Sequence, residues 1–316
     1  MQGSITEVRD TSDRRDFAAG FRRLADPKIS LASMAAMTLA AAAAWHAGGL
    51  APGWLALTVA AIFAVEVAKN ASGEIYDWRS GNDQAVAPED RSPFSGGKRV
   101  LVDGLLTQRD TWLIALAGYL VAIVAGLRIA QERAPAALPL GVLGLSLAFW
   151  YHAPPVKLAY RGLGELAVGL AYGPVLCAGT FLVQLGGVPP WVIWLSLPLG
   201  LLIALFLVAN EFPDYRADRH AGKRTLVVRL GRPAAARLFA AGMVAAGLLI
   251  VALPALGAPL GALAGLVALV PGTQAARTLL VHPDEVARIV PAQARTLLAF
   301  LLYALAAGLG TALTPR

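Results

Sequence analysis

The chain has 316 residues, of which 57% are hydrophobic and 15% charged, and its formal net charge is +7. Together with a mean hydropathy of +0.61, this composition excludes an ordinary soluble globular protein and indicates one that crosses a membrane several times. It also excludes a nucleic-acid-binding protein, because the positive charge is distributed among loops between apolar segments.

Nine apolar segments, each long enough to cross a bilayer, follow one another along the chain. They span residues 30–48, 53–72, 110–130, 135–152, 164–186, 189–211, 234–254, 257–275 and 293–313. The eighth is the weakest, because Pro271 and Gly272 interrupt its apolar run. The first 29 residues are polar and lack the apolar core of a cleavable signal peptide. The sequence therefore predicts one all-α polytopic membrane domain over residues 1–316, with nine transmembrane helices.

The lysines and arginines are distributed unevenly between the two ends of these segments. If the segments alternate in direction, 24 of the 27 basic residues fall on one face of the membrane and 3 on the other. An excess of this kind marks the cytoplasmic face. We therefore expect a cytoplasmic N-terminal segment over residues 1–29 and cytoplasmic loops after the second and sixth segments, at 70–109 and 210–232.

These two long loops carry similar motifs. In both, an asparagine at the end of an apolar segment is followed four residues later by an acid, then by a second acid and by Gly-Lys-Arg. The first motif comprises Asn70, Glu74, Asp77 and the run GKRVLV from Gly97, and the second comprises Asn210, Asp214, Asp218 and the run GKRTLV from Gly222. Four apolar segments separate them, which indicates two halves built on one plan.

The polar residues of each motif share one helix face, because positions i, i+4 and i+7 lie together. Amide and carboxylate oxygens so arranged suit a hard cation such as Mg²⁺, which also binds substrate phosphates. The candidate metal ligands are Asn70, Glu74, Asp77, Asp83, Asn210, Asp214 and Asp218, and the candidate diphosphate-binding cations are Lys98, Arg99, Lys223 and Arg224. The alternative is a solvated, salt-bridged helix end, against which the repetition of the motif on one face argues.

Two residues inside the apolar segments are also informative. Glu66 lies one turn before Asn70, where an acid is either functional or hydrogen-bonded within the helix bundle. Pro213 predicts a kink or an end of the sixth segment beside Asp214.

A third segment, YHAPPVKLAYRGLGE from Tyr151, follows the fourth apolar segment on the same face as the two acidic loops. It supplies the cations Lys157 and Arg161 and the aromatic side chains Tyr151 and Tyr160. Its position favours a part in the same site, the alternative being an ordinary connecting loop with interfacial tyrosines.

The second motif, within NEFPDYRADRHAGKRTLVVRLG, resembles the second aspartate-rich loop of the UbiA-type superfamily of intramembrane aromatic prenyltransferases. The first, with EIYDWRSGND and SGGKRVLVDGLLT, and the middle segment APPVKLAYRGLGE resemble most the branch that prenylates 1,4-dihydroxy-2-naphthoate on the way to menaquinone. The resemblance covers residues 22 to about 232. One departure is that relatives carry Asn-Asp where this chain has Gly73-Glu74.

The resemblance implies nine helices around a central cavity, in a bacterial-type inner membrane with the active site facing the cytoplasm. It also implies Mg²⁺-dependent ionisation of a polyprenyl diphosphate, followed by attack of an electron-rich aromatic acceptor on the allylic carbocation. By resemblance, the catalytic residues are Asp77, Asp214, Asp218 and Lys223, and the substrate-binding residues are Lys98, Arg99, Tyr151, Lys157, Tyr160, Arg161 and Arg224.

Other functions fit the sequence less well. A secondary transporter also combines intramembrane acids with repeats, but its binding residues usually lie near the bilayer midplane and these acids lie at one face. A phosphotransferase acting on CDP-alcohols requires an Asp-x2-Asp-Gly-x2-Ala-Arg pattern that the chain lacks. Among prenyltransferases, the alternative acceptors are 4-hydroxybenzoate, homogentisate and a chlorophyllide-like alcohol.

Overall fold

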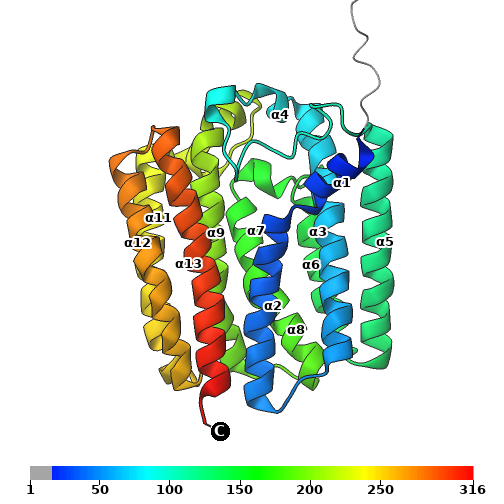
Figure 1. Ribbon diagram of the computed structural model, residues 1–316, viewed down its shortest axis with the longest axis vertical. Coiled ribbons are helices and arrows are strands. Elements are labelled where there is room, and N and C mark those ends of the chain that lie inside the picture. Colours follow the sequence, from blue (N-terminus) through cyan, green and yellow to red (C-terminus); the bar gives the residue numbers. More distant parts are fainter. Residues whose placement is uncertain (1–15, 316) are drawn as a thin grey trace, which may run out of the picture.

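The computed structural model describes residues 16–315, which form a bundle of helices and no strand. Residues 1–15 of the expected cytoplasmic N-terminal segment lie outside the described residues. Most long helices run side by side along the longest axis of the molecule (Figure 1). The short helices α1 and α4 lie at one end, which we call the capped end, and the C-terminus lies at the other (Figure 1).

The first half of the chain contains four long or apolar helices and several short ones. Their bounds are α1 Phe17–Ala25, α2 Pro27–Ala47, α3 Pro52–Ser80, α4 Asn82–Ala85, η1 Pro88–Asp90, α5 Gln108–Glu132, α6 Ala137–Trp150 and η2 Leu158–Arg161. Helix α5 begins at a capping box, in which the Thr107 hydroxyl accepts from the Asp110 N–H and the Asp110 carboxylate accepts from the Thr107 N–H.

The second half contains the remaining long helices. Their bounds are α7 Gly164–Leu170, η3 Ala171–Val175, α8 Leu176–Leu185, α9 Pro190–His220, α10 Leu226–Leu230, α11 Arg232–Ala252, η4 Pro254–Leu256, η5 Leu260–Ala268, α12 Leu269–Val281 and α13 Val286–Leu313. Helices α7, η3 and α8 form one continuous path with a π-helical turn at Pro174. Proline has no backbone N–H, so Pro174 cannot donate the regular α-helical hydrogen bond.

The structure confirms an all-helical fold with membrane-spanning capacity. In residues 16–315, eight helical segments are long and apolar enough to cross a bilayer. The fourth predicted span corresponds to α6, which has 14 residues and is therefore shorter than the roughly 20 residues of a perpendicular span. The number of nine spans and the side on which the N-terminus lies stay predictions.

Small residues let the helices approach closely, as is usual in membrane bundles. Helix α3 packs along α5, and α13 packs against α2, α9 and α12. A Cβ at Gly118 of α5 would lie 2.8 Å from the Ala64 carbonyl oxygen of α3, so the two backbones meet where a side chain has no room.

Helices α3 and α9 extend further toward the capped end than the apolar pattern predicts. The sequence places the ends of these spans at residues 72 and 211, whereas α3 continues to Ser80 and α9 to His220. Of the kink or end predicted at Pro213, the end is wrong, because α9 passes through this residue; the kink stays a prediction. The asparagine and acidic residues of each motif therefore lie on a helix end, whereas both Gly-Lys-Arg runs lie in the loops that follow.

Candidate active site

The last turns of α3 and α9 bring the acidic residues of the two motifs together at the capped end. Gly81 stops α3 in the left-handed region (φ 79°), and its N–H donates to the carbonyl oxygens of Asp77 and Trp78. On α9, the corresponding carboxylates are Asp214 and Asp218. The charge of Asp77 acts on Asp218 and that of Asp214 acts on Asp83, so carboxylates from both halves face one another.

Lys223 lies among these carboxylates and is largely buried. Its Nζ is 3.5 Å from Asp218 Oδ1 and 5.7 Å from the centre of the Tyr160 ring. Burial alone would lower the pKa of Lys223, but the negative charges of Asp218 and Asp77 raise it well above the ordinary value. Lys223 is therefore a permanent positive charge at the centre of the acidic cluster.

Asp83 lies on α4 and is buried, with 1% of its surface exposed. Its Oδ2 is buried and has no hydrogen-bond partner. Burial, together with the negative charges of Asp77 and Glu74, raises the pKa of Asp83 to about 9. Gly97 provides the space for this carboxylate, since a Cβ at its position would collide with Asp83 Oδ1.

Asp214 shows the same combination of burial and an unpartnered oxygen. Its Oδ2 accepts from the Gly96 N–H at 3.3 Å, while its Oδ1 is buried without a hydrogen-bond partner. Asp83 and Asp214 thus each keep a buried oxygen without a hydrogen-bond partner, and the neighbouring glycines Gly97 and Gly96 contact them from one loop.

The middle segment reaches the first motif through Tyr160. The Tyr160 hydroxyl donates to Asp77 Oδ1 at 2.6 Å and lies 2.8 Å from the Ser80 hydroxyl oxygen. Lys157 places its Nζ 4.9 Å from the centre of the Tyr160 ring. The structure therefore brings Lys157, Tyr160 and Asp77 together, as the sequence predicts.

His152 is a member of the site that sequence reasoning did not include. Its Nε2 lies 3.5 Å from Asp77 Oδ2, and its Nδ1 is buried without a partner. Burial lowers the pKa of His152 to about 4, against the raising effect of Asp77. The ring occupies the space beside Gly73, where a Cβ would lie 2.7 Å from it. No spacing rule connects His152 with Gly73, so the sequence offered no signal for this pairing.

Three predicted metal ligands are already hydrogen-bonded to protein groups. Asn70 Nδ2 donates to the Leu24 carbonyl oxygen at 2.7 Å, which ties α1 to α3. Asn210 Oδ1 accepts from Gln293 Nε2 at 3.1 Å, and Glu74 Oε1 accepts from the Leu101 N–H at 3.0 Å. Their part in metal binding stays a prediction.

The other predicted cations lie further from the shared carboxylates. Lys98 forms an ion pair with Asp26, and Arg99 donates to the Asp83 carbonyl oxygen at 2.7 Å. Arg161 donates to the Pro155 carbonyl oxygen at 2.8 Å and is exposed, as is Arg224. Of the four cations in the two Gly-Lys-Arg runs, Lys223 is the one that the fold places in the acidic cluster.

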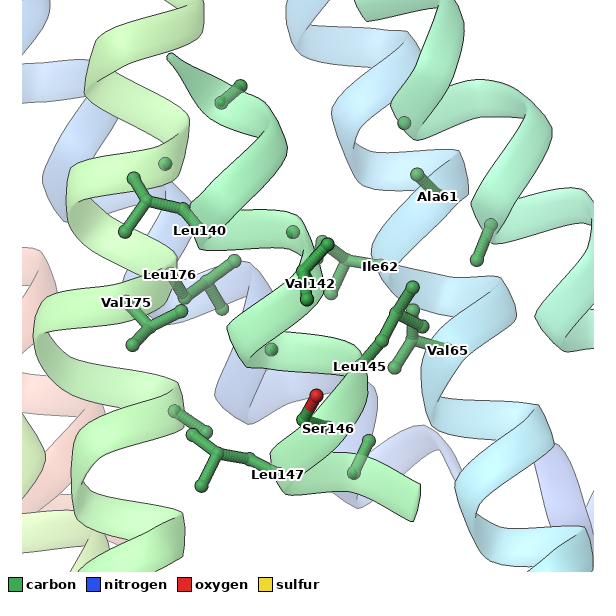
Figure 2. A pocket seen from close by; sticks show the side chains of 18 of the residues that line it. Ala61, Ile62, Val65, Leu140, Val142, Leu145, Ser146, Leu147, Val175 and Leu176 are labelled. Atoms are coloured by element: carbon green, nitrogen blue, oxygen red, sulfur yellow. The ribbon is translucent and has the colours of Figure 1, made fainter. Parts of the chain in front are cut away.

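A cavity of about 510 Å³ extends away from this cluster between α3, α5, α6 and the path from α7 to α8. Figure 2 shows Ile62 and Val65 of α3 facing the side of α6 that carries Val142 and Leu145. The lining is almost entirely apolar, and its charged members are Glu66 and Lys69. Tyr151, which the sequence places in the substrate site, also lines the cavity.

The acidic cluster suits a divalent cation that is held jointly with a phosphate ligand. Within residues 16–315, no three His, Cys, Asp or Glu side chains are arranged to hold a metal by themselves. The buried oxygens Asp83 Oδ2 and Asp214 Oδ1 nevertheless lack a hydrogen-bond partner, and a bound cation would satisfy both. Mg²⁺ commonly completes its octahedron with water and substrate phosphate, so this donor set fits it.

Two buried glutamates of the second half were also missed by the sequence analysis. Glu165 Oε1 accepts from the Leu226 N–H at 2.9 Å, and Glu211 Oε2 accepts from the Val227 N–H at 3.3 Å. Both hold the segment that follows the second Gly-Lys-Arg run. Glu165 lies in the quoted middle segment and Glu211 beside Asn210, but nothing in their spacing distinguishes an anchor of the loop from a ligand.

The chain is similar to known proteins in both sequence and fold. The profile of the UbiA prenyltransferase family matches residues 34–292. The chain is 28% identical over 194 residues to 1,4-dihydroxy-2-naphthoate octaprenyltransferase of Bacillus subtilis (strain 168), and the match covers 61% of this chain and 60% of that protein. It is 33% identical over 213 residues to the protein of the same name from Mycobacterium leprae (strain TN), with coverage of 67% and 69%.

The fold is also similar to solved structures. A UbiA homologue from Aeropyrum pernix K1 superposes with a TM-score of 0.63 at 20% identity, covering 89% of this chain and 97% of that one. A UbiA homologue from Archaeoglobus fulgidus bound to GPP and Mg²⁺ superposes with a TM-score of 0.60 at 15% identity, covering 91% and 98%. At these identities, the similarity concerns the fold.

Proposed function

Because the chain belongs to the UbiA prenyltransferase family, we propose that it transfers a polyprenyl group from a polyprenyl diphosphate to 1,4-dihydroxy-2-naphthoate. The product then enters menaquinone biosynthesis. The names of the Bacillus and Mycobacterium relatives support this acceptor. The observation that carries the proposal is the meeting of the two acidic helix ends around Lys223. Tyr151, on which the charge of Lys223 acts, links this cluster to the apolar cavity that it lines.

The acidic cluster is the proposed diphosphate site. Asp77, Asp83, Asp214 and Asp218 would hold Mg²⁺ together with the diphosphate, and Asn70, Glu74 and Asn210 are the further predicted ligands. Bound Mg²⁺ supplies neutralisation of the charge that develops on the leaving group. Lys223, fixed by Asp218, places a second positive charge there. Lys98, Arg99, Arg161 and Arg224 remain proposed diphosphate-binding residues of the surrounding loops.

The reaction breaks two bonds, the allylic C–O bond and one C–H bond of the acceptor ring, and forms one C–C bond; the ring proton passes to the departing diphosphate. The allylic C–O bond breaks and its electron pair leaves with the diphosphate, and an aromatic ring carbon then attacks the allylic carbocation. Loss of the ring proton restores aromaticity. Tyr160, held by Asp77, and Tyr151 supply aromatic faces beside the cation.

The cavity is the proposed site of the isoprenoid chain. Its walls of alanine, leucine and valine exclude water, which would otherwise capture the carbocation. A volume of about 510 Å³ suits a long apolar substrate.

We place the acidic cluster on the cytoplasmic side of a bacterial-type inner membrane, on the basis of the 24-to-3 distribution of basic residues. Gln84 is exposed on α4 at the capped end, and Cys177 is the single, buried cysteine. Gln84→Cys on a Cys177→Ser background should resist an impermeant thiol reagent in intact cells and react after permeabilisation. Labelling from outside would overturn the orientation.

The activity is tested with the purified full chain in detergent or nanodiscs. Polyprenyl diphosphates of several lengths are paired with 1,4-dihydroxy-2-naphthoate, 4-hydroxybenzoate and homogentisate, with Mg²⁺ or with EDTA. We expect a prenylated naphthoate-derived product that requires Mg²⁺. If no aromatic acid in the panel is prenylated while the protein remains folded, the proposed function is wrong.

A further inference from the structure

The polar end of the cavity carries two ionisable side chains that the diphosphate site does not use. Glu66 and Lys69 lie one turn apart on α3, and both line the cavity. Within the described part of the chain, neither belongs to an ion pair, although each feels the charge of the other. A buried charge without a close partner is costly unless a ligand supplies one.

Glu66 is oriented so that half of its carboxylate is satisfied. It is 4% exposed, and its Oε1 accepts from the Tyr172 hydroxyl at 3.2 Å. Its Oε2 is buried and lies beyond hydrogen-bond distance of any donor, although the hydroxyls of Ser33 and Ser30 are also near the carboxylate. An unpartnered carboxylate oxygen at the wall of a cavity is an acceptor for a hydroxyl or amine group of a ligand.

Lys69 lies between Glu66 and the acidic cluster. Its Nζ is 5.6 Å from the centre of the Tyr151 ring, and the charge of Asp77 acts on it. Lys69 and Asp77 are eight residues apart, which is about 12 Å along a helix axis. A group held at Lys69 would therefore lie between a diphosphate bound at Asp77 and the interior of the cavity, along the path that the prenyl chain takes.

We propose that Lys69 and Glu66 form the acceptor site, in which Lys69 binds the carboxylate of an aromatic acid and Glu66 accepts a hydrogen bond from its phenolic hydroxyl. The proposal rests on the proposed prenyltransferase function and specifies its second substrate as a hydroxylated aromatic acid. The two side chains match such a molecule, because the Lys69 ammonium can bind its carboxylate and the Glu66 carboxylate can accept from its hydroxyl. Tyr151 and Tyr172 add aromatic surface on either side of the pair.

The test compares acceptors that differ in one group. The acceptors are 1,4-dihydroxy-2-naphthoate and 1,4-dihydroxynaphthalene, which lacks the carboxylate. For Lys69→Met we expect the KM of the acid to rise at least thirtyfold, while the KM values of the diol and of the prenyl diphosphate change less than threefold. Lys69→Arg, which keeps the charge, should recover most of the affinity for the acid.

A matched control removes a cation elsewhere. Arg128 is exposed on α5 and pairs with Glu132 at 3.4 Å, so Arg128→Met should change none of the three KM values. If Lys69→Met weakens the acid and the diol equally, or raises chiefly the KM of the prenyl diphosphate, the acceptor site is wrongly assigned. If Lys69→Met does not fold, the comparison is made on the wild-type chain. The proposal requires the wild-type chain to bind the acid at least tenfold more tightly than the diol, and equal affinities would contradict it.

A binding measurement separates this proposal from the proposed function. Calorimetric titration with 2-naphthoate, without Mg²⁺ or prenyl diphosphate, should show binding to the wild-type chain and to Glu66→Gln, and loss of binding in Lys69→Met. Glu66→Gln should weaken only acceptors that carry a hydroxyl. Binding that depends on Lys69 in a chain that prenylates nothing supports the site and refutes the function. Transfer activity without any dependence on Lys69 refutes the site alone.

Discussion

The ends of α3 and α9 carry the same motif but use its second position differently. Four residues after Asn70, Glu74 accepts a hydrogen bond from the Leu101 N–H, in the loop that follows the first Gly-Lys-Arg run. Four residues after Asn210, Asp214 keeps a buried oxygen without a partner beside the acidic cluster. The equivalent residues thus have different roles: Glu74 holds a loop in the first half, and Asp214 is a proposed metal ligand in the second.

In the second half, other glutamates accept the hydrogen bonds of the corresponding loop. There the N–H of Leu226, which follows Gly-Lys-Arg as Leu101 does, donates to Glu165, and Val227 donates to Glu211. Both loops need a buried carboxylate because a buried N–H without an acceptor costs about 1–3 kcal/mol. The comparison shows that a glutamate inside an acidic motif has two possible partners, a backbone N–H and a metal.

The largest expected effect comes from the carboxylates that face the cluster in both halves. Asp214→Asn and Asp77→Asn should each lower kcat about a thousandfold, because a lost contact to the metal costs several kcal/mol of transition-state stabilisation. Turnover at saturating Mg²⁺ measures this, with thermal unfolding as the control for folding. A variant that keeps more than about a tenth of wild-type turnover would remove that carboxylate from the principal ligands.

The two lysines of the Gly-Lys-Arg runs should differ next most strongly. Lys223→Met removes the charge that lies 3.5 Å from Asp218, and we expect a loss of about a hundredfold in kcat/KM for the prenyl diphosphate. Lys98→Met breaks the pair with Asp26 and should reduce kcat/KM less than tenfold. Equal losses would mean that Lys98 reaches the diphosphate, as the sequence motif alone predicts.

Glu74 sharpens the comparison further. In Glu74→Gln, the amide oxygen still accepts from the Leu101 N–H, so we expect a loss of tenfold or less in kcat. Glu74→Ala leaves that N–H unsatisfied. It should lower the free energy of unfolding by about 1–3 kcal/mol, and with it the unfolding temperature. We expect kcat to fall as well. If Glu74→Gln loses as much activity as Asp214→Asn, the charge of Glu74 is needed by the metal.

The smallest expected effect tests the pairing of Gly73 with His152. A Cβ at Gly73 would lie 2.7 Å from the imidazole, and overpacking of this kind costs about 1–3 kcal/mol. Gly73→Ala should therefore be neutral to destabilising, because the better helix propensity of alanine offsets about 1 kcal/mol. In a His152→Ala background the same change should stabilise the protein. A double-mutant cycle by thermal unfolding measures the coupling, and additive effects would contradict the pairing.

Much of the site could be predicted from the sequence. Asp77, Tyr160 and Lys223 lie close together, and the sequence places all three segments on one face of the membrane, because basic residues mark that face. His152 could not be predicted, since its place depends on the space left by Gly73 on another helix. The proposed role of Lys69 could not be predicted either, because a lysine at the end of an apolar run is usually an interfacial anchor.

The sequence by itself determined the fold class, since apolar runs of bilayer length leave few other structures. It also determined the two acidic motifs and their resemblance to one family. Only the tertiary structure decided how far α3 and α9 extend, because their polar ends are stabilised by packing with the cap rather than by lipid. It also decided which carboxylates bind backbone N–H groups and which keep a free oxygen, since that depends on loops 20 or more residues away from Glu74.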